Sequence, residues 1–138
     1  MTVGIKLGSV TDELGEPSFF NAFFSTIVGL LENNVRGSRY PVISLDLYEG
    51  HISVKKLEQA ISELNSIQQE LLKYPPSAII WDNEDLSKNP PWEKNVSSEV
   101  TSMANYFVSS TGRDVFAIIS EVLSHALETK RPVNIVNV

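Results

Sequence analysis

Residues 17–34 of the chain read PSFFNAFFSTIVGLLENN, and their apolar side chains come in adjacent pairs four positions apart. This spacing draws a wide apolar stripe along one side of an α-helix, so it predicts a helix over about residues 18–34. Pro17 suits the first turn, because its fixed φ is helical and the N–H that it lacks would have no partner there. So broad a stripe indicates a helix that packs deeply on a sheet. The stripe consists of Phe19, Phe20, Phe23, Phe24, Ile27, Val28, Leu30 and Leu31.

Two further segments have a helical period. Residues 53–73, SVKKLEQAISELNSIQQELLK, place an apolar residue at every third or fourth position, with Ser53 available as the N-cap. Residues 110–130, STGRDVFAIISEVLSHALETK, follow the same period after Thr111 and Asp114, which form an approximate capping box. The chain is therefore predicted to contain three long helices.

Four other segments are predicted to be strands. Residues 2–10, TVGIKLGSV, and residues 41–50, PVISLDLYEG, alternate apolar and polar side chains, which is the period of a strand with one covered face. Residues 77–81, SAIIW, form a short apolar and β-branched run typical of a central strand. Residues 132–138, PVNIVNV, alternate again and predict a closing strand.

Together these elements predict an α+β fold. The expected order is strand, helix, strand, helix, strand, long loop, helix, strand, with a sheet of about four strands and three main helices packed on it. The polar face of the segment at residues 41–50 favours a sheet with one open side. A length of 138 residues fits a single domain over residues 1–138.

The composition excludes several classes of protein. Seventeen Asp and Glu against eleven Lys and Arg give a formal net charge of −6, and no group of basic residues in the sequence is larger than a pair, so direct nucleic-acid binding is not expected. A basic protein partner fits this charge.

The chain has no cysteine, hence no disulfide and no thiolate nucleophile. No segment approaches the ~18 to 20 apolar residues needed to span a bilayer, and no leader is evident, so we expect a cytoplasmic protein without a membrane partner.

None of the common catalytic or nucleotide-binding motifs occurs in the sequence. It has neither the GxGxxG nor the GxxxxGK spacing, no GxSxG, and its two histidines, His51 and His125, are isolated. Asp82, Glu84 and Asp85 are the best candidates for a metal site or a metal-dependent enzyme, because carboxylates clustered after a strand end can hold magnesium or calcium. Their spacing fails the calcium-loop template, and a plain charged surface is the competing interpretation. We therefore expect no catalytic residue, no metal site and no cofactor.

From Asp82 to about Asn95 no regular period fits, yet this segment contains Trp92 directly after two prolines. Irregular segments of this length are uncommon in compact domains unless they are functional or disordered, and disordered segments are poor in aromatic residues. Two interpretations remain open. In the first, Trp92 folds back over an apolar sheet edge. In the second, it is a prearranged aromatic anchor that docks, with the carboxylates around it, on a basic partner.

Three motifs are distinctive: IWD at residues 80–82, PPW at 90–92 and NYFVSSTGRDVF at 105–116. Through them the chain resembles the immunity protein 70 family of bacterial polymorphic-toxin and contact-dependent inhibition systems, over roughly residues 45–125. The resemblance implies an antitoxin: a small cytoplasmic protein, made beside a toxin gene, that neutralises the C-terminal domain of the toxin by direct binding. The alternatives drawn from the residues alone are a metal-binding protein or enzyme at the acidic trio, and a cytosolic adaptor for another protein.

Many toxins of such systems are basic nucleases, so the expected mechanism is an acidic surface that covers the active site or the substrate groove. Tyr106, Arg113 and Asp114 lie in the longest motif, and we expect structural roles for them because that motif opens a helix. The residues expected to bind the toxin are Trp92, Asp82, Glu84, Asp85 and Glu93, with Asp12, Glu13 and Glu16 as a second acidic patch in the first connection.

Overall fold

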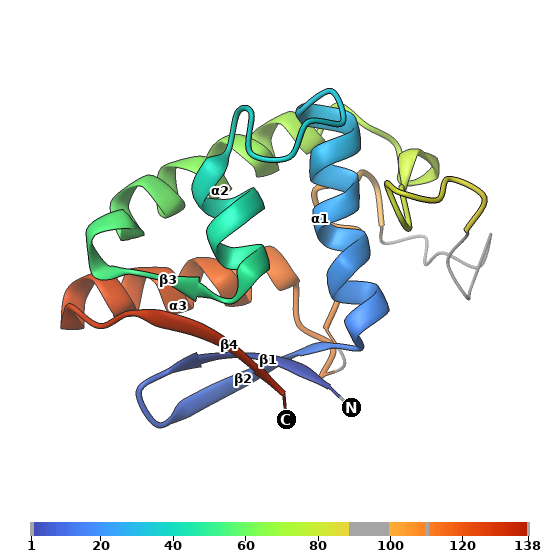
Figure 1. Cartoon of the computed structure of the whole chain (residues 1–138). Coiled ribbons are helices and arrows are strands. Elements are labelled where there is room, and N and C mark those ends of the chain that lie inside the picture. The colour runs from blue at the N-terminus through green and yellow to red at the C-terminus, as the bar shows by residue number, and fades with distance from the viewer. Residues whose placement is uncertain (1, 89–99, 110, 138) are drawn as a thin grey trace.

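The computed structural model describes residues 2–88, 100–109 and 111–137 of the chain (Figure 1). The strands and helices of this part are, in order, β1 (Val3–Leu7), β2 (Val10–Gly15), α1 (Pro17–Leu31), β3 (His51–Ile52), α2 (Leu57–Leu71), α3 (Val115–Thr129) and β4 (Val133–Asn137). Shorter helical pieces are the π-helical segment η1 (Val42–Leu47) and the 3₁₀ turns η2 (Val54–Lys56) and η3 (Pro76–Ala78).

The four strands form one antiparallel sheet in the order β2-β1-β4-β3. β1 is central, and its Ile5 lies opposite Asp12 of β2 and Ile135 of β4. The first and last strands of the chain are therefore neighbours, and the three helices lie on one side of the sheet (Figure 1). The predicted α+β class, with four strands and three main helices, is confirmed.

The order of the elements differs from the prediction, because two of the four strands lie elsewhere in the sequence. The polar residues that follow Gly8, for which no strand was predicted beyond residue 10, form β2 and make a hairpin with β1. Gly8 has a φ of +61°, a left-handed conformation that glycine adopts without strain in a tight turn. β2 is an edge strand with only two large apolar residues, the buried Leu14 and the exposed Val10, so its sequence lacks the regular apolar and polar alternation that predicts a strand.

Residues 41–50, predicted to be a strand, are mostly helical and include η1. The physical reason is a carboxylate cap. Glu32, at the end of α1, is only 1% exposed and accepts hydrogen bonds from the backbone N–H groups of Arg39 and Tyr40, both at 3.0 Å. Its other oxygen accepts from the Ser44 hydroxyl at 2.5 Å. Tyr40 directly precedes this helix, so the bond to its N–H supplies a partner that a helix start otherwise lacks, and a negative charge is favourable there.

A second buried carboxylate completes this cap. Glu63 of α2 is 7% exposed, accepts from the backbone N–H of Ile43 at 2.9 Å and from the Gln59 amide at 2.8 Å. Tertiary contacts thus override the alternating pattern of this segment, and the strand that remains is the two-residue β3.

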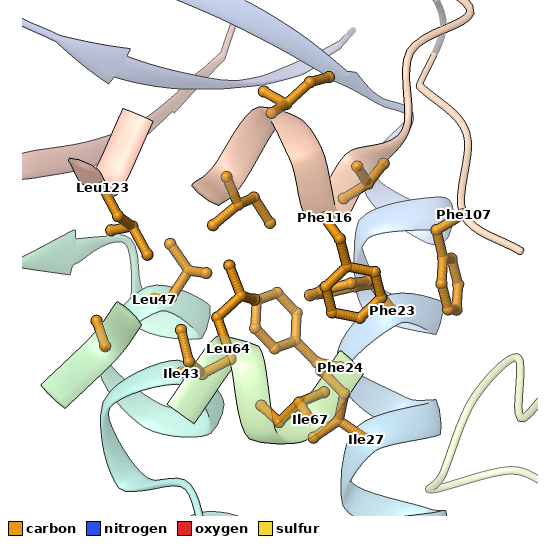
Figure 2. Close-up of a cluster of buried hydrophobic side chains, with 14 of the residues drawn as sticks. Phe23, Phe24, Ile27, Ile43, Leu47, Leu64, Ile67, Phe107, Phe116 and Leu123 are labelled. Carbon is orange, nitrogen blue, oxygen red and sulfur yellow. The ribbon is translucent and has the colours of Figure 1, made fainter. Parts of the chain in front are cut away.

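The hydrophobic core lies between the helices and the covered face of the sheet, where aromatic rings from separate elements meet (Figure 2). Phe23 of α1 is its centre, with ring centroids 5.2 Å from Phe107 and 5.1 Å from Phe116. All three side chains are at most 1% exposed. The deep packing predicted from the phenylalanine pairs is confirmed, and Phe107 attaches the segment before α3 to the same core.

Candidate functional site

The predicted strand at residues 77–81 is not part of the sheet; its second half runs along the side of α1. The Thr26 hydroxyl donates to the carbonyl of Ile80 at 3.1 Å and accepts from the N–H of the same residue at 3.2 Å. One threonine side chain thus satisfies the two backbone groups that a neighbouring strand would otherwise satisfy. The prediction of a central strand was wrong: of the apolar run only Trp81 is buried, and Ile79 and Ile80 are partly buried.

Small residues on α1 make this close packing possible. A Cβ on Gly29 would lie 2.2 Å from Cδ1 of Ile80, so a side chain there would displace Ile80. Ser25 donates to the side-chain oxygen of Asn83 at 3.0 Å, and the Asn83 amide reaches the Asn34 side chain at 3.4 Å. The segment that follows Trp81 is therefore fixed against the second half of α1, and Figure 1 shows it beside that helix.

Residues 82–88, which we call the acidic loop, fold as a series of tight turns. Asp82 accepts from the N–H of Glu84 at 3.0 Å and forms an ion pair with Lys88 at 3.5 Å. Asp85 accepts from the N–H and the hydroxyl of Ser87, at 3.1 and 2.5 Å, and these bonds lower the pKa of Asp85. Two of the three predicted carboxylates therefore shape the loop, as aspartates in turns commonly do.

The remaining side chains of the acidic loop face solvent. Glu84 is exposed, and Leu86 is 76% exposed, the highest value among the large hydrophobic residues described as exposed. Trp81, at the start of the segment, is buried instead. Trp92 and Glu93 lie outside the described residues, so the two interpretations of Trp92 remain open. The acidic loop therefore has a backbone that is held in place and two exposed side chains, the carboxylate of Glu84 and the leucine at position 86.

The structure separates the members of the second acidic patch. Asp12 lies opposite the inward-facing Ile5 and forms an ion pair with Arg113 at 3.3 Å. Glu13 lies opposite Gly4 and therefore points to the other face of the sheet, because successive side chains of a strand alternate. Glu16 is exposed and precedes α1. The three carboxylates do not share one surface.

The motif at residues 105–116 has structural roles, as predicted. Arg113 contacts Glu121 of α3 at 2.7 Å in addition to its partner on β2. Asp114, rather than Thr111, is the N-cap of α3 and accepts from a backbone N–H of the first turn at 3.2 Å. Burial raises the pKa of Asp114, and this hydrogen bond opposes the shift. Tyr106 is buried, with its ring 5.2 Å from that of the next residue.

Sequence reasoning missed the roles of Glu32 and Glu63, which cap the helix at residues 41–49. The only available signal was that Glu63 lies between Ala60 and Leu64 on the apolar side of its helix. Within the described ranges, no three His, Cys, Asp or Glu side chains come together as metal ligands. This finding includes Asp82, Glu84 and Asp85, the trio considered for a metal site.

Comparison with known proteins identifies the family. The family described as immunity protein 70 matches residues 5–135, nearly the whole chain. The chain belongs to this family. No curated protein and no solved structure matches the chain. An immunity protein acts against a toxin that it binds, and immunity proteins are generally not enzymes. In the part of the chain described here, no helix has both the length and the apolar character needed to cross a bilayer.

Proposed function

We propose that this immunity protein neutralises a basic toxin domain by direct contact through the acidic loop. The observation that carries the proposal is the exposure of Glu84 and Leu86 on a loop whose backbone is anchored to α1. An apolar side chain within a charged surround matches the centre and rim of a protein interface. Because the loop is already held in place, binding costs little conformational entropy.

The charge of the loop selects the partner. The loop carries three carboxylates and one lysine, and the chain has a net charge of −6. A negative surface accelerates the encounter with a positive one and rejects other acidic proteins. The partner we propose is a nuclease, because a nuclease must be positively charged where it contacts phosphates. The loop carboxylates then take the place of those phosphates and block the substrate groove or the active site.

The proposed setting is the cytoplasm of a bacterium that carries a polymorphic or contact-dependent toxin system. Trp92 and Glu93 follow the acidic loop closely in sequence and remain proposed contacts, as do Asp12, Glu13 and Glu16. The first test is growth of cells that express the toxin encoded beside this protein. Co-expression of the intact protein is expected to restore growth. Continued killing with both proteins present and folded would reject the proposed function.

The second test locates the contact. Glu84→Lys and Leu86→Ser should each weaken toxin binding by about ten-fold or more, since one reverses a rim charge and the other removes an apolar anchor. Matched controls are Glu58→Lys, on the exposed side of α2, and Val10→Ser, at a site 62% exposed on the hairpin. The controls should bind like the intact protein. Equal weakening by variants and controls would place the contact elsewhere.

A further inference from the structure

The uncovered face of the sheet carries a row of polar side chains. Ile5 of β1 is fully buried against the helices, so its neighbour Lys6, which is exposed, points to the opposite face. Lys6 lies opposite Asn134 of β4, which in turn lies opposite His51 of β3. No helix of the described chain covers this side (Figure 1). Lys6 and His51 are exposed, and Asn134 is partly exposed.

A hollow of ≈ 530 Å³ opens on this face. Lys6, Arg131 and Asn134 supply its polar lining, and Pro132 and Val136 supply apolar lining. None of the described residues that line it is acidic. The concentration of two cations without a carboxylate is notable in a chain with a net charge of −6.

The end of α3 sets the position of Arg131. Lys130 adopts a left-handed conformation, with φ 56° and ψ 48°, and the N–H of Arg131 donates to the carbonyl of Ala126 at 3.0 Å. This is a common way for a helix to end, and it turns the chain sharply towards β4. The guanidinium then lies over the hairpin turn, where a Cβ on Gly8 would be 2.6 Å from its Nη1. The absence of a side chain at Gly8 leaves room for the guanidinium.

The polar side chains that line the hollow, Lys6, Arg131 and Asn134, all carry N–H donors. The Asn134 side-chain oxygen lies 2.7 Å from Nδ1 of His51. An amide oxygen only accepts, so Nδ1 donates, and the Asn134 amide nitrogen keeps its own N–H groups for another acceptor. Lys6 and Arg131 have only donors, and neither forms an ion pair with a described residue. A site built from donors and positive charge recognises an oxyanion.

We propose that this cationic hollow, formed by Lys6, Arg131 and Asn134, binds the phosphate or carboxylate group of a small molecule. The planar guanidinium of Arg131 can bind two oxygens of the same group, whereas Lys6 contributes a point charge. The apolar lining by Pro132 and Val136 accommodates a nonpolar part of the ligand. The hollow lies on the sheet, away from the acidic loop on α1, so this site does not depend on the proposed toxin contact.

The test is a titration of the whole protein with inorganic phosphate, and separately with succinate, at constant ionic strength set with chloride. Two-dimensional amide NMR should show saturable shifts confined to residues around Lys6, Arg131 and Asn134. The arm with the tighter saturation identifies phosphate or carboxylate as the natural group. Absence of saturable, localised shifts with both anions would overturn the proposal.

Variants separate a specific site from general attraction of anions. Arg131→Gln and Lys6→Gln should each weaken binding about ten-fold, because a hydrogen bond to a charged group is lost. Arg131→Lys should bind with intermediate affinity, since it keeps the charge and loses the planar fork. Lys55→Gln removes an exposed lysine elsewhere and should leave affinity unchanged. Equal affinity for Arg131→Gln and the intact protein would overturn the proposal, and thermal melting checks that each variant is folded.

Discussion

The turn and helix at residues 39–47 and the acidic loop at residues 82–88 are both held by carboxylates, and they use them in opposite ways. In the first region Glu32 and Glu63 are buried, and each accepts hydrogen bonds from the backbone of that region. In the second, the carboxylate of Glu84 is exposed, and those of Asp82 and Asp85 form only local turn contacts. The number of Asp and Glu residues in the sequence therefore does not give the number of carboxylates on the surface. A buried carboxylate that accepts backbone hydrogen bonds cannot contact a partner protein.

The largest loss of stability is expected from Glu32→Ala. This change leaves the N–H groups of Arg39 and Tyr40 and the Ser44 hydroxyl without their acceptor, so the free energy of unfolding should fall by at least about 3 kcal/mol. Urea denaturation measures the loss. Glu32→Gln, which keeps one acceptor oxygen, should lose less. If Glu32→Ala is as stable as Glu84→Ala, the contrast between the two regions is wrong.

A smaller loss of unfolding free energy is expected at Thr26 of α1, which holds Ile80, two residues before the acidic loop. Thr26→Val preserves the shape of the side chain and removes the partner of both backbone groups of Ile80, which should cost about 2 kcal/mol. Hydrogen exchange of the Ile80 amide should accelerate, because its protection comes from this bond. Thr26→Ser keeps the hydroxyl and serves as the control. Unchanged exchange in the valine variant would show that another contact holds the segment.

Alkaline pH should weaken the first region through Tyr40. Burial, together with the hydrogen bond to Glu70, raises the pKa of Tyr40 from 10.0 to about 12. The folded state thus retains a proton that the unfolded chain loses. The contribution of the Tyr40 hydroxyl to the free energy of unfolding is complete below pH 10 and disappears as the pH rises through about 12. By about pH 11 the free energy of unfolding should have fallen by about 1 kcal/mol.

Comparison with Tyr40→Phe isolates this contribution, because the other tyrosines and lysines titrate in both proteins. The difference in unfolding free energy between the two should shrink from about pH 10 upwards. Ultraviolet absorbance should show one tyrosine that ionises later in the intact protein and is missing in the variant. A difference that does not change with pH would contradict the role of this hydroxyl.

The smallest effect on stability is expected in the acidic loop. Glu84→Ala removes an exposed side chain for which the described residues show no side-chain hydrogen bond, so unfolding free energy should change by no more than about 0.5 kcal/mol. Thermal and urea denaturation both measure this. A loss comparable to that of Thr26→Val would mean that Glu84 is structural, and it would remove the basis for placing the toxin there.

The helices could be predicted from sequence because their apolar period survives in the structure, as the phenylalanine pairs of α1 show. The two segments predicted as strands at residues 41–50 and 77–81 could not be assigned correctly from sequence. Residues 41–50 alternate as a strand does, but Glu32 at the end of α1 and Glu63 of α2 bind the backbone at Tyr40 and Ile43 and favour a helix, and no pattern within residues 41–50 indicates these contacts. The backbone N–H and carbonyl of Ile80 are both hydrogen-bonded, as in a strand, yet their partner is a threonine hydroxyl 54 positions away. Of the acidic loop, sequence predicted the location, but not which carboxylates are used in its turns.

The most direct test of the account is the association of the purified protein with the toxin encoded beside it, measured by surface plasmon resonance at two ionic strengths. The intact protein should associate rapidly, and its association rate should fall as salt increases, because the encounter is electrostatic. Glu84→Lys should associate more slowly with a weaker dependence on salt, and Leu86→Ser should dissociate faster. Association by Glu84→Lys and dissociation of Leu86→Ser at the rates of the intact protein would contradict a toxin contact centred on the acidic loop.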